Sequence, residues 1–144
     1  MKITEKAAFM VVGLEVNATW NELWKQMPAQ WEQFKQRHKE VDNSLNNVFM
    51  DISLGKHGDI YQQLICTEIT DSINVPTGMT VQKIPTQKYI QCRHTGPMEG
   101  IAETFGKMYK WAHKNKIHAG EMKLDIGYSK DGKEAYHDLF IKII

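Results

Sequence analysis

The sequence predicts an α+β protein in which two β-α-β-β modules form one antiparallel sheet, with helices on one side and a central ligand cleft. Apolar, β-branched segments alternate with two segments of helical periodicity. The order strand, helix, strand, strand occurs twice within 144 residues, which is the length of one domain. We therefore expect a single domain over residues 1–144, with module one at about 1–75 and module two at about 76–144.

A short motif that recurs in the two halves supports a duplication. Asp51, Ile52, Lys56 and Gly58 match Asp125, Ile126, Lys130 and Gly132 at an offset of 74, and Tyr61 and Leu64 match Tyr136 and Leu139 at 75. One inserted residue in the second half reconciles the two offsets. Because both windows follow a strand and a helix in the same order, the match predicts an internal repeat.

The first module begins with the β-branched segment 7–16, which predicts a strand. Thr19 and Glu22 have the spacing of a capping box, and they open a predicted helix. Its apolar residues recur at helical spacing: Trp20, Leu23, Trp24, Met27, Trp31 and Phe34. Pro28 lies inside this pattern and predicts a kink or a division of the helix. Residues 48–54 and 60–69 predict a hairpin.

The second module repeats this order. Residues 81–84 and 88–94 are strand-like, and Thr95-Gly96-Pro97 precedes a helical stripe. The stripe consists of Ile101, Phe105, Met108 and Ala112, with Trp111 beside it. The last segments, 124–128 and 136–143, predict a hairpin around a tight two-residue turn at Asp131-Gly132.

Each hairpin has one face that mixes carboxylates with aromatic residues. Strand alternation puts Leu124, Ile126 and Tyr128 on a core face with Leu139, Ile141 and Ile143, which leaves Asp125, Tyr136, Asp138 and Phe140 on the opposite face. In the first hairpin, Met50, Ile52, Leu54, Leu64 and Cys66 are expected to face the helix, and Phe49, Asp51, Ser53, Tyr61, Gln63 and Ile65 to face away from it. We expect the two mixed faces to meet in a cleft near the pseudo-symmetry axis.

Carboxylates among aromatic rings favour a positively charged aromatic ligand, because the ring faces and the carboxylates both attract a cation. Asp125, helped by Asp138, is the predicted counter-charge. The full set of candidate ligand-binding residues is Asp125, Asp138, Phe140, Tyr136, Asp51, Phe49, Trp24 and Trp111. The alternative is that Asp125 faces solvent and forms a surface ion pair with Lys142. Tryptophans at helical spacing are also typical of a core, so only one or two are expected at a pocket wall.

Composition and motifs exclude several other functions. The net charge of +1 argues against direct binding to nucleic acid, and no apolar run is long enough for a membrane span, so we expect a cytoplasmic protein. The two cysteines, Cys66 and Cys92, lack CxxC spacing and are expected to be buried hydrophobic residues. The six histidines show no zinc-helix spacing. No nucleophile elbow, P-loop or dinucleotide motif occurs, and we expect no metal and no cofactor.

Residues 84–116 (IPTQKYIQCRHTGPMEGIAETFGKMYKWAHKNK) resemble the GyrI-like family, also called the AraC-type effector-binding domain family. The similarity lies in a proline-led strand with Tyr89, the Thr95-Gly96-Pro97 turn, and the aromatic end of the helix at Trp111. With Trp20, Leu23 and Trp24 at the start of its first helix, the chain is most similar to the stand-alone, integron-associated effector-binding branch.

The resemblance implies a pair of β-α-β-β modules around a cleft that binds hydrophobic cations in several members. It also implies that Asp125 stands where the family commonly has a buried glutamate, and that Asp138 and Phe140 stand where members use an acidic and an aromatic residue. Many relatives are fused to a helix-turn-helix regulator, and no such domain fits this sequence. DNA binding would then come from a separate protein, and a protein partner is left open.

Two other functions remain as alternatives. Some GyrI-like proteins hydrolyse strained, cyclopropane-containing genotoxins, and here Asp125 or Asp51 would activate water. The name-giving branch inhibits DNA gyrase through an acidic exterior, which the near-neutral charge of this chain does not provide.

Overall fold

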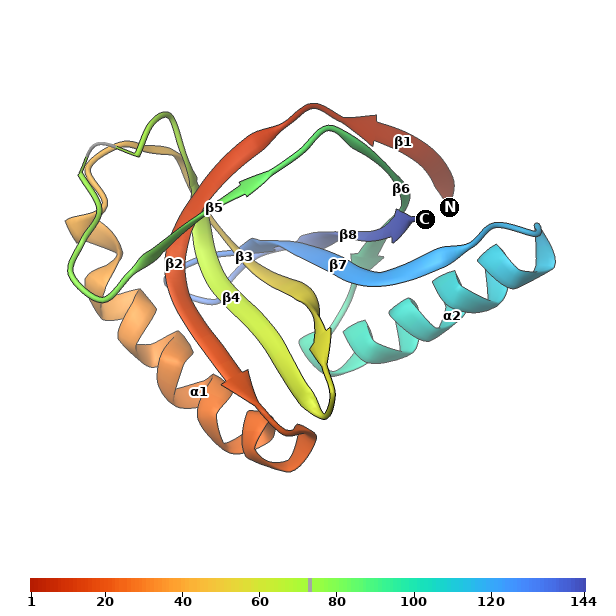
Figure 1. The fold of residues 1–144 in the computed structure, drawn as a ribbon, viewed down its shortest axis with the longest axis horizontal. Coiled ribbons are helices and arrows are strands. Elements are labelled where there is room, and N and C mark those ends of the chain that lie inside the picture. The colour runs from red at the N-terminus through yellow and green to blue at the C-terminus, as the bar shows by residue number, and fades with distance from the viewer. Residues whose placement is uncertain (73) are drawn as a thin grey trace.

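The computed structural model describes residues 1–72 and 74–144, in which eight strands form one antiparallel sheet (Figure 1). The strands are β1 (Lys2–Lys6), β2 (Phe9–Ala18), β3 (Ser44–His57), β4 (Ile60–Ile69), β5 (Thr80–Ile84), β6 (Gln87–Thr95), β7 (Ala119–Tyr128) and β8 (Tyr136–Ile143). The helices are α1 (Trp20–Arg37) and α2 (Ile101–Lys114), each next to a short 3-10 turn, η1 (His38–Glu40) or η2 (Met98–Gly100). The predicted fold class is confirmed.

The sheet has the same arrangement when followed from either edge. Its strand order is β1-β6-β8-β7-β3-β4-β2-β5, so β3 and β7 are neighbours at the centre. At the edges β1 pairs with β6 and β5 pairs with β2, so each half of the chain contributes its first strand to the other half. The alternating polar strand β1 carries too few apolar residues to be predicted from its sequence.

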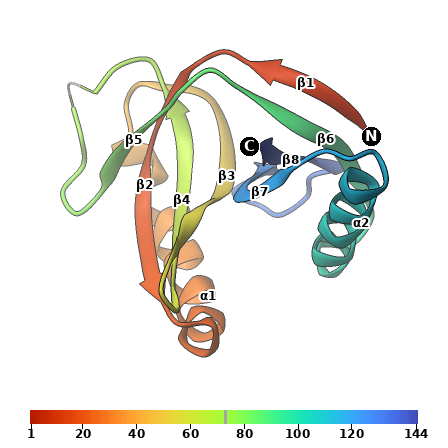
Figure 2. The ribbon, with the colours of Figure 1, turned by 45° about the vertical axis from the view of Figure 1, so that its right-hand side comes forward.

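Both helices lie on the same side of the sheet and diverge from each other (Figures 1 and 2). α1 packs on one half of the sheet through Phe34, with Phe49 and Ile65 beneath it. α2 packs on the other half through Met108, with Leu139 beneath it. The middle of the central strands β3 and β7, where Asp51 pairs with Asp125, therefore lies between two separate helix-sheet cores.

The opposite face of the sheet carries a core of its own. The buried residues of this core are Val11, Met50, Ile52, Leu64, Cys66, Tyr89, Leu124 and Phe140. The expectation that Met50, Ile52 and Leu64 face the helix is therefore wrong, although their grouping on one face is right. The carboxylate-bearing face with Asp51 is the one that the helices partly cover.

The predicted phase of the last strand is also wrong. Asp125 pairs with Leu139, and Leu124 pairs with Phe140, so Leu139 shares a face with Asp125 while Phe140 shares a face with Leu124. The hairpin itself is present, but its strands are joined by residues 129–135 and not by a two-residue turn. A shift of one residue moves every side chain of a strand to the other face.

Pro28 does not divide α1, which runs unbroken from Trp20 to Arg37. Pro28 is exposed, so water can bond the backbone carbonyl that loses its helical donor. In the described part of the chain, neither helix combines the length and the apolar character that a membrane crossing requires.

Candidate ligand-binding site

A cavity of about 690 Å³ lies between α1 and α2, over the central strands β3 and β7. Its residues come from both helices, from η2 and from three strands: Trp20, Leu23, Trp24, Met27, Trp31, Asp51, Ser53, Gly55, Lys56, Tyr61, Gln63, Met98, Ile101, Ala102, Phe105, Gly106, Tyr109, Glu121, Lys123, Asp125 and Tyr128. This volume lies within the range of small-molecule sites, which is about 300–1,000 Å³.

The floor of the cavity is formed by two aspartates that face each other across the centre of the sheet. Asp51 on β3 and Asp125 on β7 are direct partners in the antiparallel register. The Cβ atoms of such a pair lie about 4.5–5.5 Å apart. Two ionised carboxylates at this separation repel each other, so each needs a proton, a hydrogen-bond donor or a positive charge.

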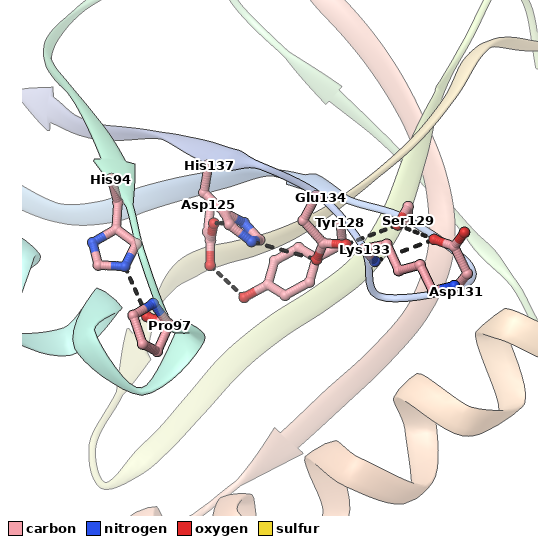
Figure 3. A network of polar contacts seen from close by, with 9 residues as sticks. All are labelled: His94, Pro97, Asp125, Tyr128, Ser129, Asp131, Lys133, Glu134 and His137. Atoms are coloured by element: carbon pink, nitrogen blue, oxygen red, sulfur yellow. Dashed lines mark hydrogen bonds and ion pairs between the residues drawn. The ribbon is translucent and has the colours of Figure 1, made fainter.

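Asp125 has such partners within the protein (Figure 3). The Tyr128 hydroxyl donates to Asp125 Oδ2 at 2.5 Å, and His137 Nδ1 donates to Asp125 Oδ1 at 3.0 Å. His137 Nε2 lies 3.4 Å from Glu134 Oε1, an ion-pair contact without hydrogen-bond geometry. Asp125 and His137 are only 6% and 2% exposed, so this pair is buried.

The pKa of His137 indicates how the charge of Asp125 is balanced. Burial lowers the pKa of His137, but the hydrogen bond and charge of Asp125 and the nearby Glu134 raise it by more, so it lies above its ordinary value. Burial and the adjacent Asp125 both raise the pKa of Tyr128, which remains a neutral donor. The contact with Asp125 therefore favours the protonated form of His137, whose positive charge compensates the Asp125 carboxylate.

Asp51 is less well compensated. Gln63 Nε2 donates to Asp51 Oδ1 at 3.1 Å, and Asp51 has no further hydrogen bond among residues 1–72 and 74–144. Burial, followed by the charge of Asp125, raises the pKa of Asp51 to about 7, against smaller lowering effects of Lys123 and Gln63. Asp51 therefore exchanges its proton near neutral pH.

A β-bulge brings Tyr128 onto the same face as Asp125. The β3–β7 pairing shifts between Phe49, which pairs with Tyr128, and Met50, which pairs with Ile126. Gly127 lies in this bulge with φ 137°, and a Cβ atom there would lie 2.8 Å from the Tyr136 carbonyl oxygen. The expectation that Tyr128 shares a face with Leu124 and Ile126 is thus wrong, because the extra residue reverses the alternation.

Aromatic side chains form the walls of the cavity. On the α1 side, the rings of Trp20 and Trp24 meet edge to face with 5.3 Å between their centroids. The rings of Trp31 and Tyr128 lie with their centroids 4.5 Å apart. Trp20 and Trp24 are 52% and 64% exposed, which leaves much of their surface free for a ligand. On the α2 side the wall is made by Phe105 and Tyr109.

Three of the predicted site residues, Asp51, Asp125 and Trp24, line this cavity together. The alternative expectation of an exposed Asp125 is wrong, because Asp125 is buried. Phe49 lies on the same face of the sheet but packs against Phe34 in the α1 core. Trp111 packs in the α2 core.

The other three predicted residues lie on the opposite face of the sheet. Asp138 forms an ion pair with Arg93 at 2.9 Å, and the Arg93 guanidinium stacks on Tyr136 at 3.7 Å from the ring centroid. Phe140 packs against Tyr89, with 5.7 Å between ring centroids. These three side chains are therefore on the other side of the sheet from Asp125, because on β8 it is Leu139, and not Phe140, that shares the face of Asp125.

Sequence reasoning missed His137 and Lys123. A usable signal for His137 was present, because Gln63 follows Asp51 by the same 12 residues that separate His137 from Asp125. If the offset of 74 is kept without an inserted residue, Gln63 aligns with His137, which identifies His137 as the residue beside Asp125 that corresponds to Gln63 beside Asp51. Lys123 shares the face of Asp125 by simple alternation, two residues away.

The geometry agrees with comparisons to known proteins. Residues 2–143 match the family described as integron-associated effector binding protein (Cass2). The structure of SAV2435 bound to tetraphenylphosphonium has a TM-score of 0.78 at 9% identity, and the match covers 99% of this chain and 93% of the SAV2435 chain. The integron cassette protein VCH_CASS2 of Vibrio cholerae has a TM-score of 0.70 at 15% identity, with 99% and 95% coverage.

The C-terminal domain of EcmrR has a TM-score of 0.71 at 13% identity, with 99% of this chain and 96% of that domain covered. A longer EcmrR chain, solved in a complex with DNA, is covered to 56% by this chain at a TM-score of 0.66 and 12% identity. No curated protein matches the sequence. At these identities the solved structures establish the shared fold, and the family match over residues 2–143 carries the assignment: this chain belongs to the integron-associated effector-binding protein family.

Proposed function

We propose that this protein binds an aromatic, positively charged small molecule in the cavity between α1 and α2. The observation that carries the proposal is the pairing of Asp51 with Asp125 at the floor of an aromatic-walled cavity. Asp125 is compensated by His137, whereas among the described residues 1–72 and 74–144 Asp51 has the neutral Gln63 as its one hydrogen-bond donor. A cationic ligand would provide a positive counter-charge for the Asp51 carboxylate.

The energetics of the empty site favour such a ligand. Asp51 has a raised pKa of about 7 because its negative charge is costly next to Asp125 in a partly desolvated cavity. A bound cation stabilises the ionised form of Asp51. Each ring face that the cation contacts, such as that of Trp24 or Trp20, adds about 0.5–2 kcal/mol depending on desolvation.

Similar proteins support a ligand of this class. SAV2435, which shares the fold, was solved with tetraphenylphosphonium, a cation whose charge is enclosed by four phenyl rings. EcmrR, which contains the same fold in its C-terminal domain, was solved on DNA. By analogy, this chain would sequester its ligand or pass the bound state to a partner, and we expect it to act in the cytoplasm.

Titration with tetraphenylphosphonium and with a neutral probe of similar size, tetraphenylmethane carrying solubilising hydroxyls, tests the proposal. We expect the cation to quench tryptophan fluorescence saturably and to bind at least about tenfold more tightly than the neutral probe. Asp51→Asn should remove this preference for the cation. Equal binding of the two probes, or an unchanged preference in Asp51→Asn, would overturn the proposal.

Hydrolysis of a strained electrophile is the second candidate, and the observation that favours it is again Asp51. A carboxyl group with a pKa of about 7 accepts a proton from water efficiently at neutral pH. Turnover of a cyclopropane-containing alkylating agent that is lost in Asp51→Asn would establish this activity. If the compound binds but is still intact after prolonged incubation, the protein binds its ligand without hydrolysing it.

A further inference from the structure

We propose that the ligand is amphoteric, because Lys123 and Ser53 form an anion subsite beside the Asp51–Asp125 pair. This inference rests on the proposed function, since it adds a second charged group to the same ligand. Ser53 and Lys123 are direct register partners on β3 and β7, and both line the cavity. A hydroxyl next to an ammonium group provides donors for a carboxylate or a similar anion.

The ammonium of Lys123 lies inside the cavity. Lys123 Nζ lies 5.9 Å from the ring centroid of Phe105 and 5.7 Å from that of Tyr109, and both rings belong to the α2 wall. These distances are near the outer limit of a cation–π contact, so the rings position the ammonium without satisfying it. The ammonium therefore lies beside the α2 wall of the cavity.

In the part of the chain that the structure describes, no group occupies the donors of Lys123. Within residues 1–72 and 74–144, Lys123 forms no hydrogen bond and no ion pair within 4 Å, although Asp51 and Glu121 influence it electrostatically. Burial lowers the pKa of Lys123, and these two carboxylates oppose the shift. An ammonium has three donors, and leaving them unpaired in a partly desolvated cavity costs free energy.

The spacing of the two subsites defines the ligand. Ser53 and Lys123 lie two residues along their strands from the Asp51–Asp125 pair, on the same face. Two residues of a strand span roughly 7 Å. A ligand with a cation and an anion about that far apart would meet both subsites, whereas a ligand with a cation alone would still pair with Asp51 but would leave Lys123 unpaired and be weakened by its charge.

Rhodamine B and its ethyl ester form a matched pair of probes, because esterification removes the carboxylate and leaves the aromatic cation. We expect wild-type protein to bind rhodamine B about tenfold more tightly than the ester, as measured by fluorescence anisotropy. Lys123→Met, which keeps the apolar stem, should reverse this order, and Lys123→Arg should preserve it. The absorbance of the bound dye would verify that rhodamine B remains in its open, charged form.

The outcomes separate this inference from the proposed function. If the ester binds as tightly as rhodamine B to wild-type protein, or if Lys123→Met leaves the order unchanged, the anion subsite is wrong while cation binding stands. If neither dye nor tetraphenylphosphonium binds, the proposed function fails first. Circular dichroism and thermal unfolding of each variant would confirm that Lys123→Met and Lys123→Arg are folded.

Discussion

The two halves of the protein make the same hydrogen bond with different chemistry. In the first half Gln63 Nε2 donates to Asp51 Oδ1 at 3.1 Å, and in the second half His137 Nδ1 donates to Asp125 Oδ1 at 3.0 Å. The strand register makes these positions equivalent, since Asp51 pairs with Ile65 as Asp125 pairs with Leu139, each two residues beyond the donor. An amide in one half corresponds to an imidazole in the other.

Because of this difference, the two equivalent carboxylates are compensated to different extents. His137 adds a positive charge and Tyr128 a second donor, so Asp125 is held in place and compensated within the protein. Gln63 adds a donor without charge, and the pKa of Asp51 rises to about 7. Near-symmetry therefore provides one carboxylate that is held by charged and neutral partners and one whose protonation changes near neutral pH.

The largest expected effect is the loss of the imidazole. His137→Leu should destabilise the protein by about 3 kcal/mol at neutral pH, because it leaves Asp125 buried without a counter-charge. Urea unfolding would measure this. The matched change Gln63→Leu should cost about 1 kcal/mol, since it removes a neutral donor from a group that can hold its own proton. Equal costs of the two changes would contradict the division of roles.

The pH dependence of that cost follows from the raised pKa of His137. A raised folded-state pKa contributes stability that is fully present below the unfolded pKa of about 6.5 and is lost as the pH rises through the folded value. The difference between wild type and His137→Leu should therefore shrink at alkaline pH.

The next effect is on cation affinity, through the proton of Asp51. If the cation requires ionised Asp51 with a pKa of about 7, its affinity should rise roughly fiftyfold between about pH 5 and about pH 7 and then level off. Equilibrium dialysis of tetraphenylphosphonium would measure this. Asp51→Asn should flatten the profile, and Asp138→Asn, on the other face of the sheet, should leave it unchanged. A flat wild-type profile would exclude Asp51 as the responding group.

Gly127 is a further difference between the halves, since Ser53 holds the position 74 residues earlier and the register of β3 with β4 shifts after it, between Ser53 and Gly55. Gly127→Ala should cost about 2 kcal/mol, because φ is 137° and the new Cβ atom would lie 2.8 Å from a backbone oxygen. Gly58→Ala also has positive φ, 62°, but meets nothing within 4 Å, so about 1 kcal/mol is expected. Thermal unfolding would measure the stability of both variants. Equal losses of stability would mean that the backbone shifts to relieve the close contact between the new Cβ atom and the Tyr136 carbonyl oxygen.

The sequence predicted the fold because its signals are local and repeated. Helical periodicity located α1 and α2, and alternation grouped Asp51 with Ser53 and Gln63 within the first hairpin. The choice of face failed because alternation defines two faces without saying which one a helix covers. On β3 both faces carry apolar residues, such as Phe49 on one and Ile52 on the other.

The site residues on β8 were misplaced by one residue. The inserted residue that aligned Leu139 with Leu64 has no counterpart in the structure, where Leu139 is equivalent to Ile65. The strand positions at Asp51 and Ile65 and at Asp125 and Leu139 keep the offset of 74, and the two hairpins differ in their bulges and turns: β3 has a register shift between Ser53 and Gly55, whereas β7 has its bulge at Gly127 and is followed by the loop 129–135. Loop length and bulges depend on backbone geometry that the apolar pattern does not encode, so Asp138 and Phe140 were assigned to the wrong face.

The smallest effect should come from making the first half resemble the second. Gln63→His places an imidazole next to Asp51, and a shared positive charge there would lower the pKa of Asp51 by about one unit, which corresponds to about 1.4 kcal/mol. The midpoint of the pH profile for tetraphenylphosphonium should shift down by the same amount, while the affinity above the midpoint falls because the new imidazolium competes with the ligand. Gln62→His, whose side chain points to the other face, is the control. An unshifted midpoint in Gln63→His would mean that burial and Asp125, and not the identity of the hydrogen-bond donor, determine when Asp51 ionises.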